Sequence, residues 1–243
     1  MPVSIAGCAV KNPLAQHDLR VCSTGDYRPF SYRDPTGRWT GLDIDLAVDL
    51  ARRERLTLRL VPTTWARLMA DLGTICELAA GGITVTPERS ARALFSVHYL
   101  RDGKAAAIRC ADHNRYTTLG DIDRPGVRVV VNPGGSNEQF DLAHLRQADI
   151  AVYPDNTNIF GQLLTGAADV MITDASEIRW QITQHAQLCG VGLDHPFIPE
   201  AKAFLVAASE PALRDRINNW LKTIQSDGKF AAISRRWLGG PVT

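Results

Sequence analysis

The chain has 243 residues, a formal net charge of +1 and 45% hydrophobic residues. This balance is ordinary for a globular protein and excludes disordered and fibrous chains. A nearly neutral chain offers no basic surface for DNA, RNA or an anionic membrane, and no run of about 18 apolar residues is available to span a bilayer. The length fits one large domain or two lobes with a sizeable core, so we expect a small-molecule ligand.

The first half of the chain alternates between short strands and helices. Residues from Asp43 place apolar side chains at helical spacing, with Asp43 as the expected cap. In chain order we expect a strand at 19–23, a turn at 34–37, a helix at 43–51, a strand at 56–61, a helix at 65–72, a strand at 78–85 and an extended stretch at 95–100.

The second half continues the alternation. A β-branched run at 127–131 ends at a Pro-Gly-Gly break before the next helix. We expect strands at 104–109 and 127–131, a helix from 137, a strand at 151–153, a helix at 158–164, a strand at 169–173, a helix at 176–184, a strand at 203–207 and terminal helices at 211–225 and 230–237. The alternation predicts α/β layers with parallel pairing.

Four loops that follow expected strands are rich in polar or aromatic residues. They lie at 24–30, 84–89, 132–137 and 173–177. In open α/β sheets, ligands bind beyond the carboxyl ends of the strands, where loops lead into helices. The sequence therefore predicts that these loops converge on one cleft.

The five cysteines lack the spacing of a zinc site. Cys22 and Cys76 lie in apolar surroundings and are expected to be small buried hydrophobic residues without a partner. Cys110 and Cys189 end apolar segments and could pair in an oxidising compartment, a choice that their positions alone leave open. No histidine spacing suggests a metal or a triad, and no nucleotide fingerprint is present, so neither a metal nor a cofactor is expected.

The amino terminus leaves the compartment undecided. Residues Ile5-Ala6-Gly7-Cys8 match the box before a lipidated cysteine in bacterial lipoproteins, yet only four residues precede it and no signal-peptide core is present. Either translation begins upstream and the chain is exported to the periplasm, with Cys8 as a candidate lipidation site, or the match is chance and the chain is cytoplasmic.

The loop motifs resemble those of the periplasmic solute-binding proteins for amino acids. The shared segments are Gly25-Asp26-Tyr27-Arg28-Pro29-Phe30, Gly41-Leu42-Asp43-Ile44-Asp45-Leu46, the run from Gly81 to Arg89, and Thr173-Asp174. Within that family the chain resembles the cyclohexadienyl dehydratases, which act on prephenate and arogenate. The strings that point to them are 24–27, 99–104, 131–138 and 173–177, and the resemblance runs from about 19 to 238.

The resemblance implies a two-lobe, periplasmic-binding-protein-like α/β fold of type II, with a central mixed sheet in each lobe. Lobe one would comprise 18–102 plus 197–243 and lobe two 103–196, with the ligand cleft between them. It also implies a disulfide between Cys110 and Cys189. The stretch 71–77 is about one residue shorter than usual and has Glu77 in place of an aspartate, so we expect a local adjustment there.

The resemblance assigns the catalytic roles to Glu177, Asn132 and Lys202. Glu177 would be the general acid, which requires a pKa raised by burial or by a neighbouring carboxylate. The alternative is a solvated carboxylate near the positive end of a helix dipole. Asn132 would bind a substrate carboxylate, and Lys202 would complete anion binding, unless it is an ordinary exposed lysine.

The resemblance also implies a set of substrate-binding residues. Arg89 would clamp a carboxylate through its planar fork of donors, and Asp174 matches the position that binds an α-ammonium group, or else it would raise the pKa of Glu177. Aromatic rings would wall the cleft, although such residues can equally be simple core. The full expected set is Asp26, Tyr27, Phe30, Trp65, Thr84, Arg89, Ser136, Asn137 and Asp174.

Two functions therefore stay open at this point. The first is dehydration with decarboxylation of prephenate to phenylpyruvate and of arogenate to phenylalanine. The second is a non-catalytic receptor that delivers an amino acid to an ABC transporter, which would use Arg89, Asp174 and the aromatic residues unchanged. Glu177 and Asn132 are the residues that discriminate. The sequence decides neither the preferred substrate nor whether the chain forms a homo-oligomer.

Overall fold

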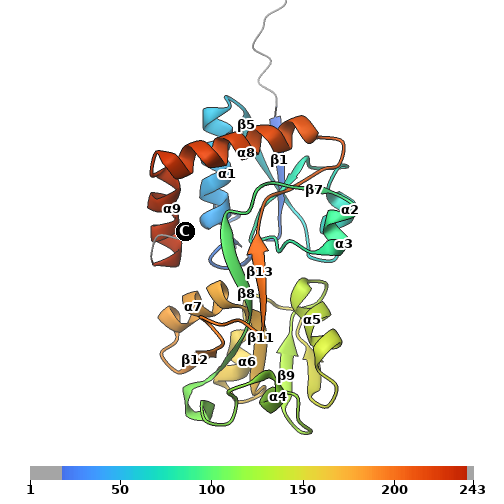
Figure 1. The fold of residues 1–243 in the computed structure, drawn as a ribbon, viewed down its shortest axis with the longest axis vertical. Helices are drawn as coiled ribbons and strands as arrows, with labels where there is room; N and C mark the ends of the chain where they lie inside the picture. Colours follow the sequence, from blue (N-terminus) through green and yellow to red (C-terminus); the bar gives the residue numbers. More distant parts are fainter. Residues whose placement is uncertain (1–17, 240–243) are drawn as a thin grey trace, which may run out of the picture.

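Two β-sheets, one above the other in Figure 1, organise the computed structural model, which describes residues 18–239. The upper sheet has the order β5-β1-β6-β14-β7, with β1 running parallel to β5 and β6 and with β14 antiparallel to β6 and β7. Its strands are β1 (Asp18–Ser23), β5 (Thr57–Pro62), β6 (Leu78–Ala79), β7 (Leu94–Phe95) and β14 (Leu205–Val206).

The lower sheet has the order β10-β9-β11-β8-β12, and β13 also pairs with β8. Strand β9 runs parallel to β10 and β11, whereas β8 is antiparallel to β11, β12 and β13. The strands are β8 (Leu100–Arg109), β9 (Arg128–Val131), β10 (Asp149–Val152), β11 (Val170–Asp174), β12 (Leu188–Val191) and β13 (Ile198–Lys202). Both sheets are mixed, as the family resemblance implied. The parallel pairing predicted from the alternation is found only for β1 with β5 and β6 and for β9 with β10 and β11.

Strands β8 and β13 carry the chain between the two sheets and pair with each other along the way (Figure 1). Their register sets Leu100 opposite Lys202 and Lys104 opposite Ile198. The expected lobe boundaries, at 102/103 and 196/197, fall within β8 and just before β13. Lys104 and Lys202 therefore lie on the two strands that join the lobes.

Helices cover both sheets. The upper lobe carries α1 (Leu42–Arg53), α8 (Pro211–Ser226), α9 (Lys229–Leu238) and the short α2 (Leu68–Asp71) and α3 (Pro87–Ser90), together with a small sheet of β2 (Asp26–Tyr27), β3 (Ser31–Arg33) and β4 (Trp39–Thr40). The lower lobe carries η1 (Cys110–Asp112), α4 (Leu119–Ile122), α5 (Ser136–His144), α6 (Phe160–Leu164) and α7 (Ala175–Gln184).

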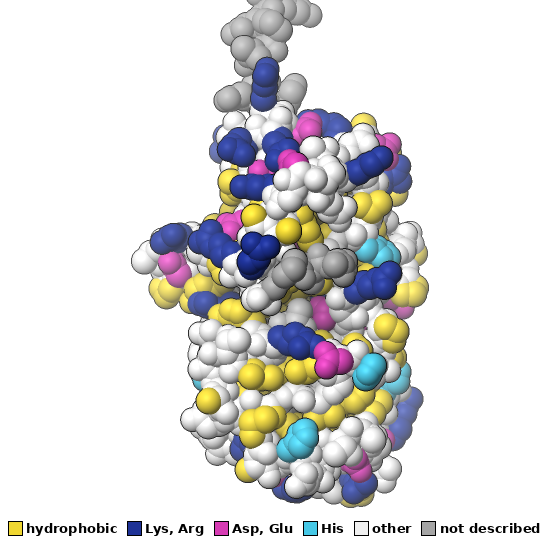
Figure 2. Space-filling view, turned by 60° about the vertical axis from the view of Figure 1, so that its left-hand side comes forward, with side chains coloured by type: hydrophobic (Ala, Val, Ile, Leu, Met, Phe, Trp, Pro, Cys, Tyr) yellow, Lys and Arg dark blue, Asp and Glu magenta, His cyan; other side chains and the backbone are white. Residues whose placement is uncertain are grey.

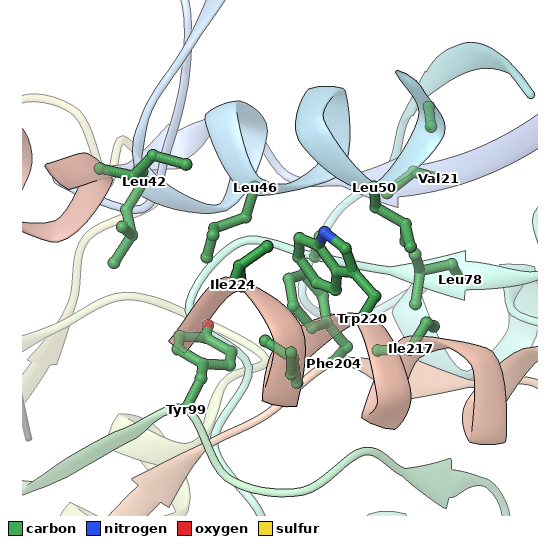
Figure 3. Close-up of a cluster of buried hydrophobic side chains, with 14 of the residues drawn as sticks. Val21, Leu42, Leu46, Leu50, Leu78, Tyr99, Phe204, Ile217, Trp220 and Ile224 are labelled. Atoms are coloured by element: carbon green, nitrogen blue, oxygen red, sulfur yellow. The ribbon is translucent and has the colours of Figure 1, made fainter. Parts of the chain in front are cut away.

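The upper core lies between α1 and α8 (Figure 3). Leu42, Leu46 and Leu50 are spaced four residues apart on α1, so they line one face of the helix. That face meets Ile217 and Trp220 of α8. The Trp220 indole also donates a hydrogen bond of 3.0 Å to Asp49 Oδ2, which satisfies its only polar atom.

The start of α1 differs from the prediction. Gly41 is its N-cap, and Asp43 lies in the first turn without capping the helix. Its carboxylate instead accepts hydrogen bonds from the backbone N–H groups of Gly81 and Gly82, at 2.7 and 2.8 Å, and from the Tyr99 hydroxyl. Gly81 and Gly82 have positive φ values of 137° and 71°, so the strand expected at 78–85 ends early and turns toward the cleft.

Several other expected elements are shorter than predicted. The helix expected at 65–72 begins only at Leu68, and the strand expected at 203–207 is confined to Leu205–Val206. The length of a short strand such as β14 depends on partner strands far away in the sequence, which local periodicity does not indicate.

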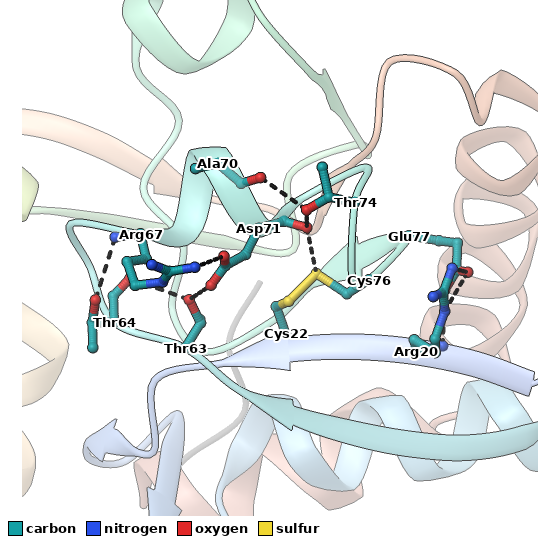
Figure 4. Close-up of a disulfide and its surroundings, with 10 residues drawn as sticks. All are labelled: Arg20, Cys22, Thr63, Thr64, Arg67, Ala70, Asp71, Thr74, Cys76 and Glu77. Carbon is teal, nitrogen blue, oxygen red and sulfur yellow. Dashed lines mark hydrogen bonds and ion pairs between the residues drawn. A yellow bond between two sulfur atoms is a disulfide. The ribbon is translucent and has the colours of Figure 1, made fainter.

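Residues 18–239 contain two disulfides, and one of them corrects the prediction. Cys110 pairs with Cys189, as the resemblance implied. Cys22 pairs with Cys76 (Figure 4), so the expectation of two unpaired buried residues is wrong. Because β1 and β6 are neighbours in the sheet, residues 54 apart in sequence come within 5.7 Å at their Cα atoms. Cys8 lies outside the described residues.

The shortened stretch 71–77 is held by its own polar contacts (Figure 4). Asp71 accepts hydrogen bonds from Thr63 at 2.6 Å and from Arg67 at 3.0 Å. Glu77 forms an ion pair with Arg20 of β1. These contacts tie the stretch to the loop before α2 and to β1.

Charged side chains of both signs are interspersed over the two lobes on the face shown in Figure 2. Between residues 18 and 239, no helix is both long enough and apolar enough to cross a membrane.

Candidate active site

A narrow pocket of about 10 Å³, which is room for about one water molecule, lies where the loops of the two lobes meet. It is lined by Tyr27, Trp65, Gly82, Thr84, Asn132, Gly135, Ser136, Asn137 and Asp174. All four loops singled out in the sequence contribute to this lining, together with Trp65. The predicted convergence on one cleft is thus observed.

Asp174 is the centre of a buried ionic cluster in this pocket. Asp174 is the last residue of β11 and is only 2% exposed. Oδ1 accepts a hydrogen bond of 2.8 Å from Lys104 Nζ, while Oδ2 accepts from Lys202 Nζ and from the Tyr27 hydroxyl. Burial by itself raises the pKa of Asp174, but the two lysines outweigh it and hold the pKa well below the ordinary value.

Lys104 belongs to this cluster and was missed in the sequence. It donates to Ser136 Oγ at 3.1 Å and to Asn137 Oδ1 at 2.6 Å, and it lies 3.2 Å from Glu200 Oε2. Burial lowers its pKa, but Asp174 and Glu200 outweigh that effect, so the net pKa is raised and the lysine stays charged. The available signal was a lysine inside an otherwise apolar strand, because a fully buried cation needs partners.

Glu177 lies in the first turn of α7 and is only 2% exposed. Thr173 Oγ1 donates a hydrogen bond of 2.5 Å to its Oε2. Burial raises the pKa of Glu177 to about 8, and the negative charge of Asp174 acts in the same direction. The carboxyl group is therefore neutral at pH 7, which rules out the alternative of a solvated helix-end carboxylate.

Arg89 supplies a second kind of anion-binding group. One guanidinium nitrogen, Nη1, donates a hydrogen bond of 2.7 Å to the carbonyl oxygen of Thr84. No carboxylate within residues 18–239 lies at ion-pair distance from Arg89. Burial lowers the pKa of this arginine, so a largely desolvated cation still has donors to offer a ligand.

The loop between β9 and α5 brings polar groups from the lower lobe to the pocket. Asn132 is buried, and its Oδ1 accepts a hydrogen bond of 3.4 Å from Asn137 Nδ2. At Gly134, whose φ is 81°, an added Cβ would lie 2.9 Å from the backbone nitrogen of Ala66 in the other lobe. The glycine thus permits the two lobes to approach closely beside the pocket.

Aromatic rings form the upper side of the pocket. Tyr27 stacks on Phe30 and meets Trp65 edge-on, with ring centroids 5.5 Å apart in both pairs. Phe30 is fully buried beneath Tyr27 and does not line the pocket. It supports Tyr27 rather than forming a wall of its own.

Four expected residues lie around the pocket but do not line it, namely Glu177, Arg89, Lys202 and Asp26. Lys202 donates a hydrogen bond of 2.7 Å to the pocket residue Thr84, so it is not an exposed lysine. Burial raises the pKa of the Asp26 carboxyl group. The backbone oxygen of Asp26 accepts a hydrogen bond of 3.1 Å from the side chain of Asn156 in the lower lobe. In the described part of the chain, no group of three His, Cys, Asp or Glu side chains could hold a metal ion.

Comparison with known proteins places this geometry in a family. Residues 19–240 match the model of the bacterial extracellular solute-binding proteins, family 3. The chain belongs to this family. Its members are described as extracellular, and the chain has the small-molecule-binding fold of the family.

Individual relatives include both enzymes and binding proteins. A cyclohexadienyl dehydratase from Pseudomonas aeruginosa is 43% identical, over 90% of this chain and 82% of the relative. An ancestral cyclohexadienyl dehydratase structure is also 43% identical, with a TM-score of 0.56 over 91% of this chain and 92% of the other. An ancestral amino-acid-binding protein, described as a precursor of cyclohexadienyl dehydratase, is 31% identical, with a TM-score of 0.84 over 91% and 95% of the two chains.

Proposed function

We propose that the protein is a cyclohexadienyl dehydratase, a lyase that converts prephenate to phenylpyruvate and arogenate to phenylalanine. The observation that carries this proposal is the buried carboxyl group of Glu177, which is joined through Thr173 to the pocket residue Asn137. Burial raises its pKa to about 8, so it holds its proton at neutral pH. A solute receptor has no need for a proton donor, whereas this reaction depends on one.

The bonds that break in the reaction explain why it depends on a proton donor. The C–O bond to the ring hydroxyl breaks as the ring carboxylate leaves as CO2, and the electron pair released from the broken C–C bond completes the aromatic ring. Hydroxide is a poor leaving group, so Glu177 would donate its proton and release water instead. The resulting Glu177 carboxylate would regain a proton from solvent before the next turnover.

The other residues would hold the substrate. Arg89 and Lys202 supply positive charge for its two carboxylates, and Asn132 with the backbone of Ser136 and Asn137 at the start of α5 supplies hydrogen-bond donors. Tyr27 and Trp65 would contact the ring and exclude water. Thr84 would contact the substrate through a hydroxyl that already accepts a hydrogen bond from Lys202.

Asp174 would act on Glu177 through its negative charge. Both of its oxygens already accept hydrogen bonds from protein donors. Its negative charge contributes to the raised pKa of Glu177. This charge suits an acid that must keep its proton, which a receptor does not need.

The decisive experiment is the formation of phenylpyruvate from prephenate, read by absorbance. We expect the parent to turn over and Glu177→Gln to lose activity by about 100-fold or more. Glu210→Gln, which changes a glutamate at the start of α8 remote from the cleft, is the matched control and keeps full activity. A parent that binds an amino acid tightly but forms no phenylpyruvate would be a receptor.

We also propose that the chain works in an oxidising, exported compartment. Its two disulfides support this, because disulfides persist in the periplasm and are reduced in the cytosol. Fractionation of the native host, followed by blotting, tests the location. Recovery of the protein in the cytosolic fraction with free thiols would refute it.

A further inference from the structure

A continuous chain of hydrogen bonds runs from Lys104 to the carboxyl group of Glu177. Lys104 Nζ lies 2.6 Å from Asn137 Oδ1, Asn137 Nδ2 lies 2.9 Å from Thr173 Oγ1, and Thr173 Oγ1 lies 2.5 Å from Glu177 Oε2. All four side chains are buried. Which atom donates and which accepts in each hydrogen bond can be deduced from the kinds of atoms involved.

Lys104 decides the orientation of the Asn137 amide. An ammonium group has only donors, so the Asn137 atom that faces it must be the carbonyl oxygen. The NH2 group of Asn137 then faces Thr173 Oγ1 and donates to it. A flipped amide would set the NH2 against the ammonium group, with two donors facing each other.

The hydrogen bond from Asn137 to Thr173 fixes the direction of the next hydrogen bond, from Thr173 to Glu177. Its oxygen accepts from Asn137, and its single hydroxyl hydrogen needs an acceptor. In the described chain, Oγ1 has only Asn137 and Glu177 as hydrogen-bond partners. If Glu177 donated to Thr173 instead, the hydroxyl hydrogen would be buried without an acceptor, which is costly.

We infer that Thr173 is a positioning residue that makes Glu177 Oε2 a hydrogen-bond acceptor and so places the catalytic proton on Oε1. Lys104 and Asn137 set the direction of the chain, and Thr173 transmits it. The inference rests on the proposed function of Glu177 as the general acid. Within the described chain the Thr173 hydroxyl bonds only to Asn137 and Glu177, so its effect on the reaction passes through the acid.

The same hydrogen bond has a second effect that can be measured. The Thr173 hydroxyl stabilises the ionised form of Glu177 more than the neutral form and thus lowers its pKa, in opposition to burial. Removal of the hydroxyl should therefore raise the pKa of Glu177. The fraction of protonated acid would then increase, while its proton would no longer be confined to one oxygen.

The test is the pH dependence of kcat in Thr173→Val, which keeps the shape of the side chain and removes the hydroxyl. We expect kcat at pH 7 to fall about tenfold or more with KM nearly unchanged, and the alkaline limb of the profile to move up by about one pH unit. Thr173→Ser restores the hydroxyl and should restore both values. Thr183→Val, on the exposed side of the same helix as Glu177, is the control and should match the parent.

An unshifted alkaline limb in Thr173→Val would overturn the inference, as would a serine variant that behaves like the valine variant. If Thr173→Val does not fold, Thr173→Cys supplies a weaker donor of similar size and must show the same changes at smaller amplitude; unchanged values there would equally refute it. A parent without dehydratase activity would instead refute the proposed function, so the two failures are distinguishable.

Discussion

Replacement of Glu177 by glutamine should abolish activity and at the same time stabilise the fold. Glutamine keeps the size of the side chain and can still accept the hydrogen bond from Thr173. It has no proton to lose, so it avoids the cost of holding a buried carboxyl group in its neutral form. The buried acid required for catalysis therefore lowers the free energy of unfolding at neutral pH.

The size of the effect follows from the two pKa values. The ordinary pKa of a glutamate is 4.5, and burial raises that of Glu177 to about 8. Between these values the unfolded chain has lost the proton and the folded chain retains it, so the stability of the parent falls as pH rises. Each pKa unit corresponds to about 1.4 kcal/mol. At pH 7 the accumulated cost is about 3 kcal/mol, and Glu177→Gln should recover a large part of it.

The assay is urea unfolding of the parent and Glu177→Gln at pH 4, 5.5, 7 and 8.5. We expect the difference in free energy of unfolding to be near zero at pH 4, to widen up to about pH 8 and to level off above it. Glu210→Gln serves as the control and should show no such divergence. A difference that is the same at every pH would mean that Glu177 is ionised in the folded protein, and the acid assignment would fail with it.

Three further changes test other parts of the structure. Arg89→Lys keeps the charge but loses the planar fork, so KM for prephenate should rise about tenfold in steady-state assays, whereas an unchanged KM would remove Arg89 from the site. The carboxyl group of Asp141 is buried without a hydrogen-bond partner, and burial raises its pKa to about 8. The stability of the parent therefore falls as the pH rises from about 4 to about 8. Asp141→Asn should have a higher melting temperature than the parent at pH 8 but not at pH 4. Removal of the Cys110–Cys189 bridge, which joins residues 79 apart, should cost about 4 kcal/mol in denaturant unfolding, and equal stability would show that the bridge is not formed in solution.

Local patterns predicted the alternating α/β layers, whereas the two lobes with mixed sheets were implied by the family resemblance. The leucines of α1 recur every four residues on one face, and the β-branched run of β9 ends at a Pro-Gly-Gly break. Such periodicities report which side of an element is buried, and the loops between elements then indicate where a ligand binds. The roles of Glu177, Asn132 and Arg89 came from the family resemblance, because an isolated glutamate, asparagine or arginine has no distinctive pattern.

Long-range pairing decided the rest. Cys22 meets Cys76 only because β1 and β6 are neighbours in a sheet, and Lys104 meets Asp174 only because β8 lies beside β11 in the register of the lower sheet. The direction of the hydrogen bonds that lead to Glu177 likewise depends on side chains from three separate elements. Sequence determines the surface that each element presents, but which surfaces face each other is settled by packing over the whole chain, and that packing sets the charge and the proton of a buried group.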